Sequence, residues 1–193
     1  MASRVPAASQ FAVYGPTFLD VVMGPLDGPP VPGREAWVEG ALMCAGGAAN
    51  QAIALARLGA PVRLHSRVGV DQMGAFVDEM LAREGVDTSS CERVGDQNVT
   101  VSLSFDGDRA MTTRGTTVLP RLGGDAPACL LADVRGISAN SEVVSAWRER
   151  GTWVLADTAW DEAGAWDEAD LESLRLADVC TPNEEEALAY ART

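Results

Sequence analysis

Short runs of apolar residues alternate along the chain with longer stretches in which apolar residues recur every three or four positions. The apolar runs predict buried strands at 11–15, 61–69, 129–134, 152–158 and 178–182. The stretches between them predict helices at 48–58, 73–84, 141–150, 168–176 and 184–192. Nearly continuous apolar strands separated by helices of this length are typical of a parallel sheet with helices on both faces. We therefore predict a three-layer α/β/α fold with a mostly parallel central sheet.

Two segments break this rhythm. Residues 99–114, VTVSLSFDGDRAMTTR, alternate apolar and polar positions around an Asp-Gly pair, which predicts an antiparallel hairpin with one face in water. Residues 24–43 begin rich in proline and glycine and end in the strand-like run EAWVEGALM. We expect both segments to form a small β-layer outside the main sheet, inserted in one α/β domain that spans residues 1–193.

The composition excludes several classes of function. The 193 residues include 28 acidic and 15 basic ones for a net charge of −13, and the basic residues are all arginine. Without lysine there can be no P-loop lysine, Schiff-base lysine or strand lysine of the protein-kinase type. The negative charge argues against nucleic acid or an anionic membrane as a partner. With neither a membrane-length apolar run nor a leader-like start, we expect a cytoplasmic protein that binds small molecules.

The start of the first predicted helix is the most informative stretch. CAGGAANQAIALARLG, residues 44–59, places two glycines and an asparagine before an almost wholly apolar helix, which must be buried on most sides. Its first turn then presents backbone N–H groups and the Asn50 amide toward an interior crevice. Gly46 and Gly47 allow a ligand to approach closely, because they lack a Cβ atom, and a polyol or an oxyanion would fit there. Alternatively, the glycines form a tight loop and Asn50 only caps the helix.

Several motifs occur together in one order. Residues 46–89, which start with GGAANQAIALARLG and include GVDQMG at 69–74, closely resemble the first signature region of the ribokinase-like (PfkB) carbohydrate kinase family. GPTFLD, at 15–20, resembles that family's first strand and its sugar-binding aspartate, here Asp20. DVCTPNEEEALAY, at 178–190, is similar to the region of its Asn-x-x-Glu motif. The joint occurrence of these motifs is far more specific than any one of them.

The resemblance implies a fold and a reaction. Family members have a three-layer α/β domain and a small β-sheet lid that closes over a sugar, and segments 24–43 and 99–114 fall where that lid would lie. In such kinases a sugar hydroxyl attacks the γ-phosphate of ATP, and the protein positions the reactants and stabilises charge. ATP and Mg²⁺ are therefore the expected cofactors. Family lids often pair between subunits, so a homodimer through the lid is expected as well.

The resemblance also assigns roles in substrate binding. Asp20 would accept hydrogen bonds from substrate hydroxyls, and Gly46, Gly47 and Asn50 would hold further hydroxyls at the helix start. Arg114 resembles an arginine of fructokinase-like and ketodeoxygluconate-kinase-like members, where it could pair with a carboxylate or phosphate. This favours a sugar or sugar acid as the substrate. The alternative for Arg114 is a solvated side chain at a strand end.

At the other end of the predicted site, the resemblance assigns Asn183 and Glu186 to Mg²⁺ and phosphate, with Glu186 reaching the metal through bound water. A second interpretation is a capped helix start, with Asn183 as N-cap and the acidic residues of NEEEA favoured by the helix dipole. With the rest of the family pattern present, we expect both roles to hold together. Asp157 ends a predicted strand at the edge where ligands of open α/β sheets gather. The residues after it depart from the family pattern, so it receives no role.

The largest departure from the family lies at the C-terminus. Members carry a later Gly-Ala-Gly-Asp segment that supplies the catalytic base and an anion hole, and this sequence ends at Thr193 without it. A base contributes roughly 10²–10⁴ in rate, so the 193-residue chain alone is predicted to be inactive. The chain is then either a shortened piece of a true kinase or a non-catalytic sugar-binding or regulatory protein. A dinucleotide-binding domain is a weaker alternative, because no G-x-G-x-x-G follows the first strand.

Overall fold

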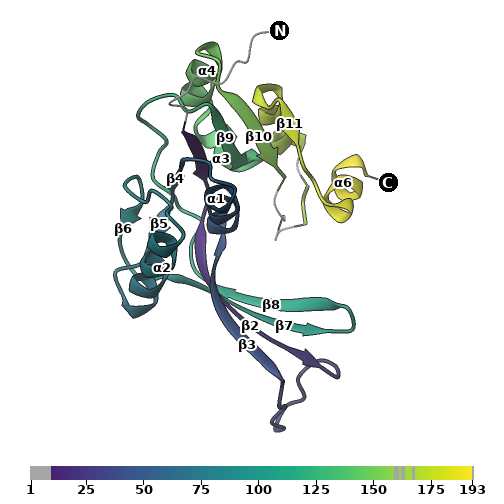
Figure 1. Cartoon of the computed structure of the whole chain (residues 1–193). Helices are drawn as coiled ribbons and strands as arrows, with labels where there is room; N and C mark the ends of the chain where they lie inside the picture. The colour runs from purple at the N-terminus through teal and green to yellow at the C-terminus, as the bar shows by residue number, and fades with distance from the viewer. Residues whose placement is uncertain (1–9, 159–160, 162–163, 167, 193) are drawn as a thin grey trace.

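The computed structural model describes residues 10–158, 161, 164–166 and 168–192. Its central sheet has five parallel strands in the order β11-β10-β9-β1-β4 (Figure 1). The strands are β1 Phe11–Tyr14, β4 Val62–His65, β9 Cys129–Asp133, β10 Trp153–Asp157 and β11 Val179–Cys180. All five correspond to predicted apolar runs, so the parallel sheet is confirmed.

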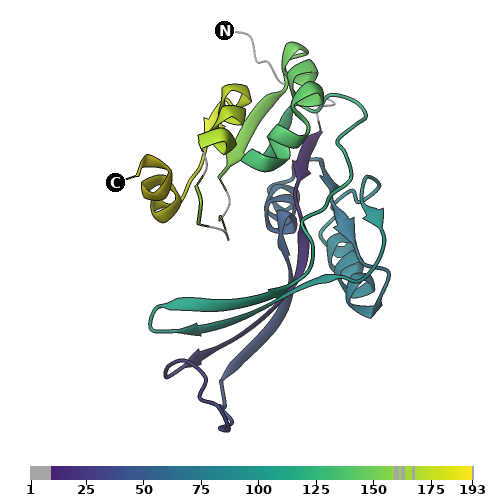
Figure 2. The same ribbon diagram turned by 180° about the vertical axis from the view of Figure 1, so that it is seen from behind.

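Helices cover both faces of this sheet (Figures 1 and 2). One face carries α1 Ala48–Arg57 and α2 Gln72–Arg83. The other carries α3 Val134–Ala139, α4 Ser141–Glu149 and the 3₁₀ helix η1 Glu172–Leu176, while α5 Glu168–Leu171 precedes η1 and α6 Glu184–Ala191 follows β11. The three-layer α/β/α class is confirmed.

The alternation of side chains along β1 produces the two cores. Val13 is fully buried in the cluster that includes residues of α1 and α2. Its neighbours Ala12 and Tyr14 point the other way, into the cluster that holds Trp147 of α4. Because successive strand residues face opposite sides of a sheet, one short apolar strand serves both cores.

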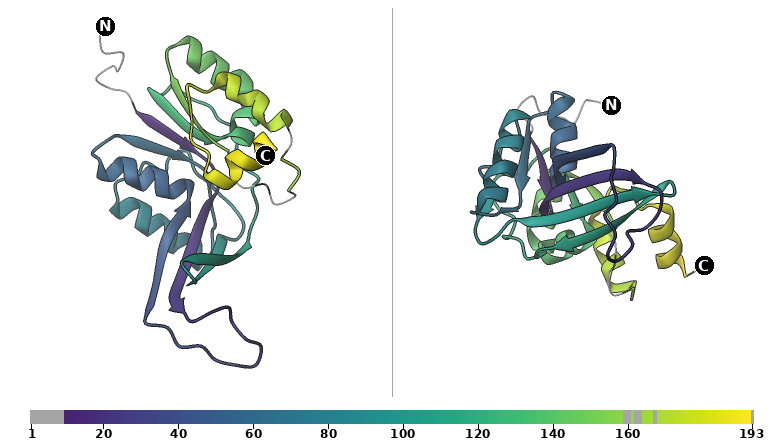
Figure 3. Two further views of the ribbon diagram at one scale, coloured as in Figure 1. Left: turned by 90° about the vertical axis from the view of Figure 1, so that its right-hand side faces the viewer. Right: turned by 90° about the horizontal axis from the view of Figure 1, so that it is seen from below.

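A second sheet lies outside the central one and extends away from it (Figures 1 and 3). Its order is β3-β2-β7-β8, with β2 parallel to β7 and the two outer pairs antiparallel. The strands are β2 Thr17–Leu26, β3 Gly40–Gly47, β7 Asn98–Phe105 and β8 Asp108–Arg114. Asp106 and Gly107 have φ of 54° and 80°, as a two-residue hairpin turn requires. The predicted additional β-layer therefore exists, but its bounds differ from the prediction: it starts at Thr17, earlier than the pattern indicated, and the run EAWVEGALM is a strand only from Gly40 onward.

Local differences from the predicted elements have physical reasons. The strand predicted at 61–69 is divided at Ser66, whose hydroxyl donates to the Gly15 carbonyl at 2.6 Å, and continues as β5 Arg67–Val68, which pairs with β6 Glu92–Arg93. The helix predicted at 168–176 changes from α to 3₁₀ at Glu172. The pattern gave no sign of α3, which is short and is capped by Asp133. No helix in the described part of the chain is long and apolar enough to span a membrane.

Leu130 provides a test of the packing. It is the second residue of β9 and fully buried, so Leu130→Ala should lower the free energy of unfolding by about 2–5 kcal/mol. Denaturation in urea measures the change. Leu58→Ala is the matched control, since the Leu58 side chain is 83% exposed and its removal should change the value by less than about 0.5 kcal/mol. Equal losses in the two variants would contradict the assigned core.

Candidate functional site at the second sheet and the start of α1

Asp20 lies on β2 of the second sheet. The expectation that it belongs to the first strand is wrong, because the chain leaves the central sheet at Gly15 and Pro16 before β2 begins. The ladder places Asp20 beside Thr100 on β7, and Thr100 is in turn opposite Thr113 on β8. Paired residues project from the same face of a sheet, so these three side chains share one face. The two threonine hydroxyls are 3.1 Å apart.

Sequence reasoning missed Thr100 and Thr113. The alternation in 99–114 marked them only as polar positions of a hairpin. Register with β2 is what links them to Asp20, and it joins strands about 80 residues apart. No pattern within the hairpin itself carries that information.

The two glycines before α1 are required by close approaches. A Cβ atom added at Gly46 would lie 1.8 Å from Asp20 Oδ2, so it is the Asp20 carboxylate that occupies the space a side chain would need. Gly47 has a φ of 63°, and a Cβ atom there would lie 2.4 Å from the Pro16 carbonyl oxygen. The sequence predicted that a ligand approaches these glycines closely. At Gly46 the group that approaches is the carboxylate of Asp20, a candidate substrate-binding residue.

The start of α1 has no side-chain cap. Gly47 is the N-cap residue, and the backbone N–H of Ala48 donates to the Pro16 carbonyl at 2.9 Å. Asn50 is exposed and does not cap the helix, so the alternative that gave it this role is wrong. The expectation that its amide faces an interior crevice is wrong as well, because the side chain lies on the exposed side of the helix. The remaining N–H groups of the first turn are therefore open to a ligand or to water.

A cavity of about 220 Å³ lies at this helix start. Of the expected site residues, Gly47 lines it. Its lining comes from β1 and the β1–β2 joint, α1 and the carboxyl ends of β9 and β10: Tyr14, Gly15, Pro16, Gly47, Ala48, Gln51, Asp133 and Asp157. The cavity is thus at the carboxyl edge of the parallel sheet, where open α/β folds bind ligands.

Two carboxylates from adjacent strands face this cavity. Asp133 ends β9 and Asp157 ends β10, and the two residues are register partners. Burial raises the pKa of Asp133 and the nearby Asp157 charge raises it further, while the 2.5 Å hydrogen bond from the Gly136 N–H lowers it. Asp157 received no role from the sequence, and Asp133 was missed although it is the penultimate residue of the strand predicted at 129–134.

The side chain of Asp20 is also partly buried. Burial raises the pKa of its carboxyl group, and a hydrogen bond from the Thr100 side chain lowers it. Burial is the larger effect. A half-buried carboxylate beside a hydroxyl accepts hydrogen bonds strongly, since fewer water molecules compete for it.

Asn183 and Glu186 form a capping box at the start of α6. The Glu186 N–H donates to Asn183 Oδ1 at 2.8 Å, and Glu186 Oε2 accepts from the Asn183 N–H at 3.0 Å. The same Oε2 accepts from the Thr158 hydroxyl at 2.6 Å, and Glu186 is only 6% exposed. The structural alternative for NEEEA is therefore confirmed. Among the described residues, no three histidine, cysteine or acidic side chains cluster to hold a metal ion.

Arg114 is not brought together with Asp20. It pairs in register with Val99, one position from Thr113, so its side chain leaves the opposite face of the second sheet. There it forms an ion pair with Asp96 at 2.5 Å, and the arginine side chain is 68% exposed. An exposed pair of this kind contributes little to stability. The structure thus supports the solvated alternative for this arginine.

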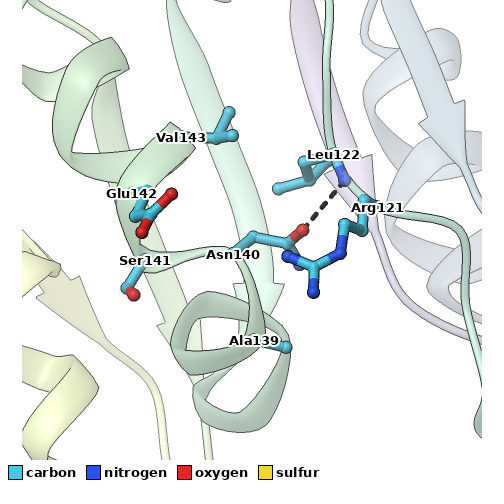
Figure 4. Close-up of a pocket in the computed structure, with 7 residues that line it drawn as sticks. All are labelled: Arg121, Leu122, Ala139, Asn140, Ser141, Glu142 and Val143. Atoms are coloured by element: carbon cyan, nitrogen blue, oxygen red, sulfur yellow. Dashed lines mark hydrogen bonds between the residues drawn. The ribbon is translucent and has the colours of Figure 1, made fainter.

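A smaller cavity of about 160 Å³ lies where the connection from β8 to β9 meets the junction of α3 and α4 (Figure 4). Arg121 and Glu142 line it together with Asn140. The buried Asn140 amide accepts from the Leu122 N–H and donates to the Gly136 carbonyl, both at 2.9 Å. This arrangement fixes the long connection to the helical layer. None of the expected site residues lies here.

The chain is similar to known carbohydrate kinases in part of its sequence and in its fold. Residues 38–116 match the model of the pfkB family carbohydrate kinases. The expected resemblance to the PfkB carbohydrate kinases is thus confirmed over residues 38–116. The matched residues contain β3, α1, α2 and most of the second sheet, and so include Gly46, Gly47 and Asn50. The 2-dehydro-3-deoxygluconokinase of Bacillus subtilis (strain 168) is 46% identical over 56 residues, which are 29% of this chain and 17% of that protein.

Solved structures show the PfkB kinase fold over nearly the whole chain. The fructokinase of Xylella fastidiosa superposes with a TM-score of 0.75 at 24% identity, covering 95% of this chain and 62% of the enzyme. The same fructokinase with bound ATP gives 0.75 at 23% identity, over 95% and 64%. A nucleoside kinase of Methanocaldococcus jannaschii gives 0.73 at 16% identity, over 95% and 64%. The chain therefore spans a little under two thirds of these kinases.

The raised pKa of Asp20 predicts a pH effect on stability. The folded state holds the carboxyl proton more tightly than the unfolded chain, so stability falls as pH rises from about 3.9 through the raised pKa. Asp20→Asn removes this loss. Urea denaturation at pH 3 and at pH 7 should show the variant gaining stability relative to the wild type at the higher pH. A constant difference at both pH values would contradict the assigned environment.

Proposed function

We propose that the protein is a carbohydrate kinase that transfers the γ-phosphoryl group of ATP to a hydroxyl of a sugar or sugar acid in the cytoplasm. The observation that carries this proposal is the row of Asp20, Thr100 and Thr113 on one face of the second sheet, next to the uncapped start of α1. Carboxylate, hydroxyl and backbone N–H groups together can both accept and donate hydrogen bonds. That combination suits a polyol, which presents the same two capacities.

In this proposal Asp20 accepts hydrogen bonds from substrate hydroxyls, and its reduced contact with water strengthens them. Gly46 leaves the space that keeps the carboxylate in place, and Gly47 leads directly into the first turn of α1. Asn50 is exposed on that turn, so it could contact a bound sugar. Arg114 could reach a substrate only by leaving Asp96, which makes it a weaker candidate than the other residues.

ATP binding is proposed by analogy with the fructokinase structure that contains it. Mg²⁺ would neutralise charge on the phosphates. The residues present fit a hydrated ion better than a direct protein cage, because Glu186 Oε2 already accepts two hydrogen bonds and the described residues form no ligand cluster. A hydrated Mg²⁺ needs only one or two carboxylates. Glu186 would then contact it through water, while Asn183 keeps the helix start in place.

Binding measurements on this chain test the substrate site. Titration calorimetry with 2-dehydro-3-deoxygluconate and with fructose should detect binding of at least one, and Asp20→Asn should weaken it by about 10–100-fold, as expected for a lost hydrogen bond to a charged group. Asp108→Asn, at the far end of the hairpin, is the matched control and should bind like the wild type.

The two sugars also divide the substrate classes. Preference for 2-dehydro-3-deoxygluconate would favour a sugar acid, and preference for fructose a neutral ketose. Binding of neither, or equal binding by Asp20→Asn and the wild type, would contradict the proposal. Sugar binding without phosphoryl transfer from ATP in the complete protein would support the non-catalytic sugar-binding alternative.

We also propose a homodimer through the second sheet. On the face opposite Asp20, the side chains of β2, β3 and β7 are apolar beyond the part that packs on the helices, while β8 adds Thr112 opposite Val101. Val101 and Met43 on this face are 37% and 53% exposed. The strand register places the following apolar side chains on that face: Val21, Met23, Ala41, Met43, Val101, Leu103 and Ala110. A self-complementary apolar face of this kind is suited to a two-fold interface with a second copy.

Light scattering tests this arrangement. Val101→Glu places a charge in the middle of the apolar face and should convert a dimer to a monomer, because an unpaired charge is costly to bury. Val118→Glu, at a side chain 73% exposed outside the sheet, is the control and should leave the mass unchanged. A wild-type chain that is monomeric at high concentration would contradict the proposal.

A further inference from the structure

Gln97 is a polar side chain in the most buried part of the joint between the two sheets. It immediately precedes β7 and is 1% exposed. Its Nε2 donates to the Thr17 carbonyl at 2.9 Å and to the Asn98 carbonyl at 3.1 Å, and its Oε1 accepts from the Gly69 N–H at 2.9 Å. One amide therefore connects the start of β2, the start of β7 and the turn before α2.

The turn that Gln97 contacts is the GVDQMG stretch. Asp71 caps α2 by accepting from the Gly74 N–H at 2.8 Å, and its other oxygen accepts from the Gln97 N–H at 3.2 Å. A Cβ atom added at Gly69 would lie 2.3 Å from the backbone nitrogen of Gln97, so this turn packs directly against the start of β7. The motif that the sequence identified as a family signature here serves as the anchor of the second sheet.

A second set of hydrogen bonds fixes the same joint from the side of β2. The Thr17 hydroxyl, fully buried, lies 2.8 Å from the Ser66 hydroxyl, which donates to the Gly15 carbonyl. Among the described residues, no buried side-chain nitrogen or oxygen lacks a hydrogen-bond partner. The joint is a fully satisfied polar network, and such networks specify one geometry.

The register relates this joint to Asp20. Asp20 follows Thr17 by three residues on β2, and Thr100 follows Gln97 by three residues. At about 3.3 Å per residue, both lie roughly 10 Å from the shared amide. A shift at the base of either strand would therefore move the carboxylate and the hydroxyl that face the proposed substrate.

We infer that Gln97 is a positioning residue for substrate binding: its amide clamps β2 and β7 to the GVDQMG turn and so sets where Asp20 and Thr100 stand. This inference rests on the proposed function for its link to a sugar, but the three hydrogen bonds of the Gln97 amide do not depend on that function. Only an amide both donates twice and accepts once at this place. Glutamate would lose both donors, and methionine would lose all three hydrogen bonds while keeping the length of the side chain.

Hydrogen exchange on the full chain without ligand tests the clamp. In Gln97→Met, the protection of backbone amides from exchange at 18–22 and 98–102 should fall by about tenfold. The reason is that these strands can then open locally without first breaking the hydrogen bonds of the Gln97 side chain. Protection at 130–132 and 154–156, in the central sheet, should stay as in the wild type. Gln72→Met, at an exposed glutamine at the start of α2, is the matched control.

A merely structural role would give a different result, since lost global stability raises exchange in both sheets together. Equal changes in the two sheets, or no change at 18–22, would overturn the inference. If Gln97→Met does not fold, Thr17→Val removes the hydroxyl contact with Ser66 at the same joint and should loosen the same two strands to a smaller extent.

Sugar binding then separates this inference from the proposed function. If Asp20→Asn weakens binding of 2-dehydro-3-deoxygluconate or fructose, Gln97→Met should weaken it by about tenfold as well, and unchanged affinity would overturn the positioning role. If Asp20→Asn has no effect on binding, the proposed function fails, and the exchange result alone decides whether Gln97 positions the second sheet.

Discussion

The structure depends on a joint of two residues. Gly15 and Pro16 are all that separates β1, at the centre of the parallel sheet, from β2 in the second sheet. The Pro16 carbonyl accepts from the first N–H of α1, and the Gly15 carbonyl accepts from Ser66. The central sheet, the second sheet and the start of α1 therefore meet at one point. Asp20 and Asn50 are placed by their distance from that point along β2 and α1, and Thr100 and Thr113 follow from the register of β7 and β8 with β2.

The site around this joint is made from acceptors and backbone donors. Asp20 projects from the second sheet, while Asp133 and Asp157 stand at the ends of the central strands. Burial raises the pKa of Asp20 and of Asp133, so both groups carry an electrostatic cost that a hydrogen-bonding partner would reduce. Arg114 lies on the other face of its sheet. The geometry thus favours recognition through hydroxyl groups, which donate to carboxylates without adding charge.

Most of the fold could be predicted because its signals are local. Each central strand is a short apolar run, and α1, α2, α4 and α6 begin and end within about one residue of the predicted positions. The capping box at Asn183 was visible in NEEEA for the same reason. The break at Ser66 was not predictable, because it depends on a hydrogen bond to Gly15 elsewhere in the fold. The helix α3 was missed although its cap, Asp133, is local, because six residues are too few to show a helical period.

The candidate site was only partly predictable, for a related reason. Asp20, Gly46 and Gly47 carry motif signals in the sequence, and the structure brings them together. Thr100, Thr113 and Asp133 carry none, since their importance comes from strand register and from the edge of the sheet. Arg114 is the opposite case: the sequence marked it as a candidate, but it lies one position from Thr113 on β8, so its side chain is on the opposite face of the sheet from Asp20.

Glu186 Oε2 accepts two hydrogen bonds, which limits how residue 186 can be substituted. One carboxylate oxygen closes the first turn of α6 and binds the Thr158 hydroxyl that follows β10. A substitution selected to alter the chemistry at this position would also loosen the helix that presents it. The role proposed for Glu186 at Mg²⁺ is therefore tied to the architecture of the helix start, because any change of this side chain also alters its contacts with Asn183 and Thr158.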